Sequence, residues 1–128
     1  LVEAARVGQA STDQSRRWLN EYGLVLFLQE RFDEAAGIFQ RSLDLAEEMT
    51  QAVRISVLFN LGSAHMGARR YPQALALLEN VAGLAEEHLG SEHQLTFRIW
   101  VQLGELYRIL EQPDGERAIE EKLARHNL

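Results

Sequence analysis

The chain has 128 residues, of which 46% are hydrophobic and 25% charged, as is typical of a single folded domain and not of a disordered segment. The formal net charge of −6 disfavours nucleic acid as a partner, and the absence of cysteine excludes disulfides and thiol chemistry. Because no apolar run is long enough to cross a membrane, we expect a soluble, cytoplasmic protein that binds neither membranes nor nucleic acid.

The first predicted elements are a partial helix over residues 1–8 and a full helix over residues 12–28. The chain begins with Leu1 and its first residues already read as helical, so we expect a fragment of a longer protein. The helix over 12–28 carries an apolar stripe whose spacing places its members on one helical face. This stripe consists of Leu19, Tyr22, Gly23 and Leu26.

A second helix is predicted over residues 32–48, and its sequence pattern recurs from Tyr71 onwards, where a helix is predicted over 72–88. Between the two segments, the glycine-containing stripe recurs in a helix predicted over 52–68. Its members are Leu58, Leu61, Gly62 and His65. Repetition over such a distance is the signature of stacked helical units, so consecutive helices are predicted to form antiparallel hairpins.

A third copy comprises helices predicted over 93–110 and 114–126. Its stripe consists of Trp100, Leu103, Gly104 and Tyr107. A glycine inside a helix costs about 1 kcal/mol relative to alanine, so three glycines at corresponding places indicate close approach of a neighbouring helix. We expect two small residues, Ala35 and Ala74, to supply the surface that faces the first two of these glycines.

Two further features concern the boundaries of the predicted helices. Gly90 is expected to end the helix before it, and Ser91 with Gln94 is a candidate capping box for the next one. The last predicted helix, 114–126, is charged and has few large apolar residues, so it is either a capping helix or a truncated repeat.

The repeated stripe, followed by a small residue in the second helix, resembles the tetratricopeptide repeat. The spacing from Gly62 to Gly104 and the linker over 89–97 are similar to the longer repeats of kinesin light chains. The resemblance implies an all-α superhelix, or solenoid, of about three stacked antiparallel hairpins. It would form a single domain over residues 1–128, with repeats at about 15–48, 54–88 and 96–126.

Large apolar and aromatic residues of the stripes and second helices are predicted to form the core of this stack. They are Leu19, Tyr22, Phe39, Leu58, Leu61, Leu78, Trp100, Leu103 and Tyr107. We predict right-handed stacking of the hairpins, without significant β-structure.

Titratable residues give no sign of a catalytic or metal site. His65 is predicted to be a hydrogen-bonded core residue, His88 and His93 to belong to a linker, and His126 to be solvated. Adjacent glutamates such as Glu86 and Glu87 point in different directions on a helix and are read as solvated. We therefore expect no catalytic residue, no metal and no cofactor, and we do not expect an enzyme.

In tetratricopeptide-like arrays, the first helix of each hairpin lines a concave face that receives a peptide. The resemblance thus implies a protein- or peptide-binding scaffold module, part of a larger regulatory or signalling protein. Asn60 is the strongest candidate, because Asn60-Leu61-Gly62 resembles the family's asparagine that clamps a ligand's main chain. The groove residues singled out as the site are Arg17, Asn20, Phe59, Asn60, Ser63, Arg98, Gln102 and Glu105. Further candidates on the same helices are Leu24, Phe27, Met66 and Arg108.

Two alternatives stay open at this point. Each groove candidate could equally be an ordinary solvated residue, and the module could serve self-association through the ends of its stack, as a homo-oligomer without a groove ligand. The resemblance also argues against one class of ligand, the acidic chaperone tail. Its clamp needs cations and asparagines on successive first helices, and only Asn60 and Arg98 match that pattern.

Overall fold

The computed structural model describes residues 2–45 and 49–126, so the end of the helix predicted over 32–48 lies outside the described residues. The described part of the chain forms six α-helices and no strand, in agreement with the predicted all-α class. They are α1 (Val2–Leu28), α2 (Phe32–Asp44), α3 (Gln51–Gly67), α4 (Tyr71–His88), α5 (Gln94–Ile109) and α6 (Pro113–His126).

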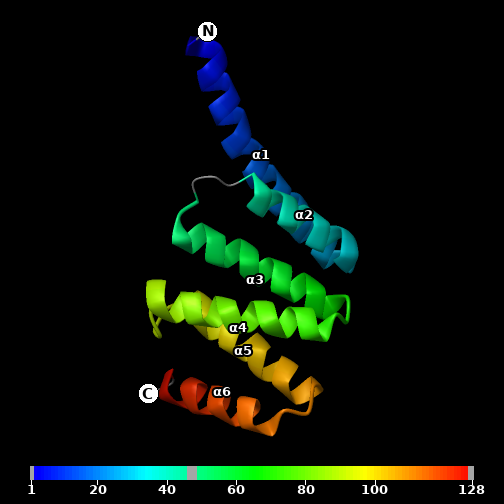
Figure 1. Ribbon diagram of the computed structural model, residues 1–128, viewed down its shortest axis with the longest axis vertical. Coiled ribbons are helices and arrows are strands. Elements are labelled where there is room, and N and C mark those ends of the chain that lie inside the picture. Colours follow the sequence, from blue (N-terminus) through cyan, green and yellow to red (C-terminus); the bar gives the residue numbers. More distant parts are fainter. Residues whose placement is uncertain (1, 46–48, 127–128) are drawn as a thin grey trace.

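The helices pair as three antiparallel hairpins that follow one another along the long axis of the molecule (Figure 1). Helix α2 packs against α3 and α4 packs against α5, so each hairpin rests on the next through its second helix. The two termini lie at opposite ends of the stack (Figure 1). The predicted solenoid of stacked helical hairpins is confirmed.

Helix α1 differs from the prediction because it is continuous from Val2 to Leu28, whereas two helices over 1–8 and 12–28 were expected. The intervening residues, Gln9, Ala10 and Ser11, include no proline, and Gly8 before them lowers helix stability by only about 1 kcal/mol. The first half of α1 therefore continues the helix and projects beyond α2 (Figure 1).

The turn inside each hairpin contains one residue whose backbone adopts the left-handed conformation. None of these three residues is glycine. Glu30, Arg69 and Glu111 have φ values of 61°, 63° and 55°. In each turn the next residue donates its N–H to a carbonyl five residues back, as from Arg31 to Leu26 at 2.9 Å. These are Schellman-type ends, in which a left-handed residue lets the last helical carbonyls find partners.

The linker between α4 and α5 confirms one predicted boundary and corrects another. Gly90 ends α4 with φ of 89° and donates its N–H to the carbonyl of Ala85 at 3.0 Å. The cap of α5 is His93, whose Nδ1 accepts the N–H of Leu95 at 3.0 Å, so the predicted Ser91–Gln94 capping box is wrong. The helix begins later than that box requires, which makes the imidazole the nearest acceptor.

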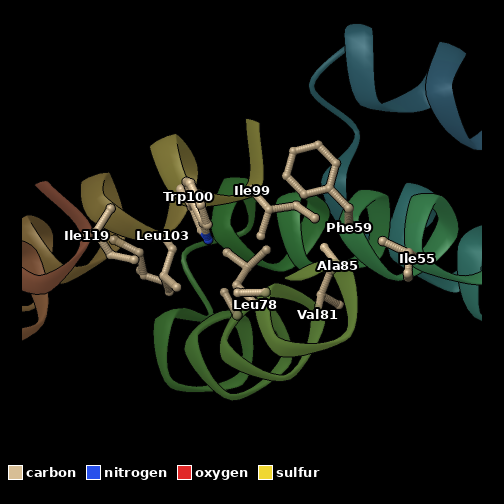
Figure 2. Packing of buried hydrophobic residues seen from close by; sticks show 12 residues of the cluster. Ile55, Phe59, Leu78, Val81, Ala85, Ile99, Trp100, Leu103 and Ile119 are labelled. Carbon is tan, nitrogen blue, oxygen red and sulfur yellow. The ribbon is translucent and has the colours of Figure 1, made fainter. Parts of the chain in front are cut away.

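The core is formed by two clusters of buried side chains. The larger cluster joins α3 to α6 and includes Leu78, Val81, Ile99 and Trp100. Figure 2 shows side chains of this cluster from all four helices, including Phe59 of α3 and Ile119 of α6. The smaller cluster joins α1, α2 and α3 around Phe39. The predicted core residues Phe39, Leu61, Leu78, Trp100 and Leu103 are buried, whereas Leu19, Leu58 and Tyr107 are half-buried.

Tyr22 was expected in the core but is 50% exposed. Its counterpart in the second hairpin, Leu61, is buried against the first hairpin. Tyr22 lies on the same face of α1, where no described helix covers it. The stripe therefore identifies a position that is buried only where another hairpin precedes it.

The stripe glycines do mark close approach of two helices, but their facing residues are large rather than small. A Cβ at Gly23 would lie 2.5 Å from the ring of Phe39, and one at Gly62 would lie 2.9 Å from Leu78. These glycines make room for the bulky side chain of the second helix. The expectation that Ala35 and Ala74 face them is thus wrong, although both alanines are fully buried.

Candidate functional site

A groove runs along the first helices α1, α3 and α5, where off-stripe residues three and four positions apart share one face. On α3 this face carries Phe59, Asn60 and Ser63, and on α5 it carries Arg98, Gln102 and Glu105. Two neighbouring hollows of about 330 and 480 Å³ lie along it, and Phe59, Arg98 and Gln102 line both. The structure thus brings six of the eight predicted residues to one continuous surface.

Polar side chains bridge the three helices beneath this groove. The Asn60 amide donates to Oδ1 of Asn20 at 3.3 Å, which links α3 to α1. The Ser63 hydroxyl donates to Oε1 of Gln102 at 2.9 Å, which links α3 to α5. The amide of Gln102 in turn approaches the sulfur of Met66 at 3.5 Å. These bonds fix the rotamers of the amides, so their remaining donors and acceptors are held in place.

Arg98 is the exposed cation of the groove. Its guanidinium lies 5.4 Å from the centre of the Phe59 ring, in a cation–π arrangement. Among the described residues, no carboxylate lies within ion-pair distance of Arg98. Glu105 of α5, the acidic residue among the predicted groove residues, forms an ion pair with Arg108 at 3.3 Å. Arg98 therefore keeps donors that an anionic group entering the groove can use.

The first hollow is apolar at the end formed by the first hairpin. Leu24, Phe27 and Leu28 of α1 line it together with Phe39 of α2. Asn60, Ser63, Arg98 and Gln102 of α3 and α5 line the same hollow, so it combines apolar and polar groups. Such a combination suits a ligand that buries one apolar side chain and hydrogen-bonds through its main chain.

Two predicted residues lie outside the hollows, and three that line them escaped the sequence analysis. Arg17 is exposed on α1 and lines neither hollow, and Asn20 takes part only through its bond to Asn60. Leu28, Phe97 and Val101 line the hollows without having been singled out. Val101 lies between Arg98 and Gln102 on α5, and helical spacing could have identified it.

His65 has a structural role at the junction of the first two hairpins. Its Nδ1 accepts the Nε–H of Arg70 at 2.9 Å, and Arg70 also forms an ion pair with Asp33 of α2. Burial lowers the pKa of His65 below its ordinary value, and the neighbouring guanidinium of Arg70 lowers it further. The imidazole is therefore held in its neutral form as a hydrogen-bond acceptor.

Neither a metal site nor a membrane-spanning helix occurs in the part of the chain that the structure describes. No three histidine, aspartate or glutamate side chains there are placed together to hold a metal ion. None of the described helices combines the length and the apolar character that a membrane span requires.

Comparison with known proteins gives one matching family and several similar folds. The tetratricopeptide repeat model matches residues 53–125, more than half of the chain. Two crystal structures of a candidate kinesin light chain of Podosopora anserina, with nearly identical TPR-like repeats, share the fold at 18% identity. The first has a TM-score of 0.74 and the second, a single-substitution variant, 0.75.

The matched region covers 86% of this chain but only 54% and 53% of those two chains, so this chain spans about half of their length. Comparison with curated proteins gives no match. The likeness to kinesin light chain repeats, expected from the spacing between Gly62 and Gly104, is confirmed at the level of the fold.

Proposed function

Because the chain belongs to the tetratricopeptide repeat family, we propose that it is a binding module whose groove holds an extended segment of a partner protein. Repeats of this family are generally scaffolds for protein interaction rather than catalysts. The observation that carries the proposal is the pair of hollows that meet at Phe59, Arg98 and Gln102. We further propose that the module serves a larger regulatory or signalling protein of the cytoplasm.

The chemistry of the groove favours a peptide with one acidic group beside an apolar side chain. Arg98 offers charge-assisted hydrogen bonds to a carboxylate, which are stronger than bonds between neutral groups. The amide of Asn60 can serve the main chain of the peptide, because it combines donors with an acceptor. The apolar residues Leu24, Phe27 and Leu28 provide a hollow for the neighbouring side chain.

An acidic tail that needs two cationic clamps does not suit this groove. At the position that corresponds to Arg98, the first hairpin has Arg17, which lies outside both hollows. Gln102 stands where a further cation would be needed. A ligand with several carboxylates would thus leave most of them without a charged partner, and each such loss costs about 1.5–3 kcal/mol.

The proposal can be tested with a display library of random peptides selected on the immobilised chain. We expect enriched peptides to share an acidic residue next to an apolar one, and to bind with micromolar affinity by calorimetry. The double variant Asn60→Ala/Arg98→Ala should weaken binding by about tenfold or more, because it removes the main-chain anchor and the charge-assisted bond. A chaperone-type acidic tail peptide should show no binding.

The matched control is Asn80→Ala/Arg117→Ala, which makes the same two replacements at exposed positions of α4 and α6. This variant should bind the selected peptides as the unaltered chain does. Failure to enrich any peptide, or equal affinity for both double variants, would show that the groove is not the binding surface.

A further inference from the structure

The turn into α4 carries an arginine that reaches back to the first hairpin. The turns of the first two hairpins lie at the same edge of the stack (Figure 1). From the second of these turns, Arg70 forms an ion pair with Asp33 of α2 and donates its Nε–H to Nδ1 of His65 at 2.9 Å. Arg70 thus links α3 of the second hairpin to α2 of the first, and a neutral imidazole serves as its acceptor.

This arrangement is specific to the junction of the first and second hairpins. Gln112 is the counterpart of Arg70 in the third hairpin, because each donates its N–H to the carbonyl five residues back. At the next junction the acid, the acceptor and the arginine are replaced by Pro72, Tyr107 and Gln112. In the first hairpin the counterpart of His65 is Leu26, which is buried. Of the three copies, the second therefore carries a side chain that changes its charge near neutral pH at this position.

Protonation of His65 would remove the acceptor that Arg70 uses. An imidazolium carries a proton on both ring nitrogens, so Nδ1 could no longer accept, and two positive charges would lie side by side. Within the described residues, the charged groups that face His65 are Arg70 from the turn and Asp33 from α2, and α1, α5 and the body of α4 present none. The contact between α3 and the turn would change from attractive to repulsive.

The pKa of His65 fixes the pH range of this change. Burial and the Arg70 guanidinium lower the pKa, and the Asp33 carboxylate raises it to a smaller extent. The folded chain therefore takes up this proton only below the ordinary value of 6.5. The contribution of the neutral imidazole to stability is fully present above that value, and it is lost as the pH falls through the lower pKa of the folded state.

Aromatic packing connects this junction to the first hollow of the groove. Phe32, which precedes Asp33, packs its ring directly on Gly67 of α3. The same ring meets Phe27 of α1 edge-on, with 5.2 Å between the two ring centroids. Phe27 lines the first hollow, whereas the second hollow, of about 480 Å³, is lined by α3 and α5. Movement of the first hairpin would therefore alter the first hollow and leave the second intact.

We propose that protonation of His65 moves the turn end of the first hairpin away from the second and so weakens binding in the first hollow. Leu61 and Ala64 of α3 keep their apolar contacts with the first hairpin, so the hairpin tilts without detaching. The loss of binding rests on the function proposed above, whereas the tilt does not depend on it. The groove thus holds its ligand more tightly at neutral than at acidic pH.

Distance measurements between two spin labels test the tilt without any ligand. The sequence contains no cysteine, so labels attach only where cysteines are introduced. The pair Gly37→Cys/Ala76→Cys, at exposed and corresponding positions of α2 and α4, spans the first junction. The distance between its labels should increase when the pH is lowered from about 8 to about 5.5, a range that brackets histidine titration. The matched pair Ala76→Cys/Arg117→Cys spans the second junction, where the distance should not change.

The variant His65→Gln isolates the contribution of the imidazole. Its amide oxygen can accept from Arg70 but does not titrate in this range, and the other three histidines of the sequence remain. Across the first junction, its label distance should be independent of pH. In the unaltered chain, an NMR titration of the His65 imidazole should show proton uptake below pH 6.5, in parallel with the change in distance. A distance that ignores pH, or that responds equally in His65→Gln, would overturn the proposal.

Peptide binding separates this proposal from the one on which it rests. The probe is the peptide most strongly enriched from the display library, carrying a fluorescent label. It should bind the unaltered chain about fivefold or more weakly at the acidic pH, and His65→Gln with equal affinity at both pH values. If the labels move but no library peptide binds, the proposed function fails and the tilt stands. If a peptide binds the unaltered chain equally well at both pH values, the regulation by His65 is overturned and the proposed function stands.

Discussion

Gly62 of α3 and Gly83 of α4 are both helical glycines, but only Gly62 is pressed against a neighbouring helix. A Cβ at Gly62 would lie 2.9 Å from Cδ2 of Leu78, whereas one at Gly83 would meet nothing within 4 Å. Leu78 is fully buried and cannot move aside without disturbing the core. Substitution should therefore have opposite effects at the two sites.

Gly62→Leu is expected to lower the free energy of unfolding by ~1–3 kcal/mol, because it overpacks the contact with Leu78. Gly83→Leu should raise it by up to about 1 kcal/mol, since leucine favours the helix more than glycine does. Urea denaturation followed by circular dichroism measures both. If the two variants had equal free energies of unfolding, Leu78 would have to move away from residue 62 without destabilising the fold.

For single residues, the sequence predicted which positions lie at close helix contacts. It was less successful at predicting which residues they contact. The stripe pattern correctly marked Gly62 as a site of close approach, because helical spacing depends on the local sequence alone. It could not show that Leu78 rather than Ala74 lies opposite, since that depends on how the second helix rotates against the first. The burial of Tyr22 likewise depends on a neighbouring hairpin and not on α1 itself.

The three hairpin turns place Glu30, Arg69 and Glu111 in the left-handed region, at some cost in conformational energy. The sequence gives no sign of this, because these residue types have no marked preference for positive φ. The turn is instead imposed by the two helices that it joins and by the hydrogen bonds of the Schellman-type ends. The extents of α3 to α6 could be predicted from periodicity, but the turn conformation could not.

Replacing Glu111 with glycine should relieve this cost, because glycine adopts positive φ without steric conflict. We expect Glu111→Gly to raise the free energy of unfolding by up to about 1 kcal/mol. The matched substitution Glu120→Gly, at an exposed position inside α6, should lower it by about 1 kcal/mol. Thermal and urea denaturation of the two variants would reveal the contrast, and destabilisation by both would contradict the argument.

The groove shows which part of a candidate site follows from the sequence and which part depends on how the helices pack. Helical spacing brought Asn60, Ser63 and Gln102 together correctly, since all three lie on first helices at corresponding phases. The exclusion of Arg17 from the hollows could not be foreseen, because it depends on how α1 lies against α3. Leu28 was missed because it ends a continuous apolar run over 24–28, in which the sequence does not separate groove positions from core positions.

For the whole molecule, the distribution of the core determines which hairpin opens first. In a repeat array each hairpin is stabilised mainly by its immediate neighbours. The central hairpin contacts another on both sides, and α4 lies between α3 and α5 in the larger cluster. The first hairpin belongs only to the smaller cluster and leaves Tyr22 and Trp18 exposed. Local opening should therefore require less free energy at the first hairpin than at the centre.

Amide hydrogen exchange followed by mass spectrometry should reveal this gradient. At a concentration where the chain is monomeric, amides of α4 should exchange more slowly than those of α1 between residues 15 and 28, because opening the central hairpin breaks two interfaces instead of one. Uniform exchange along the chain would instead show that all three hairpins unfold as one unit.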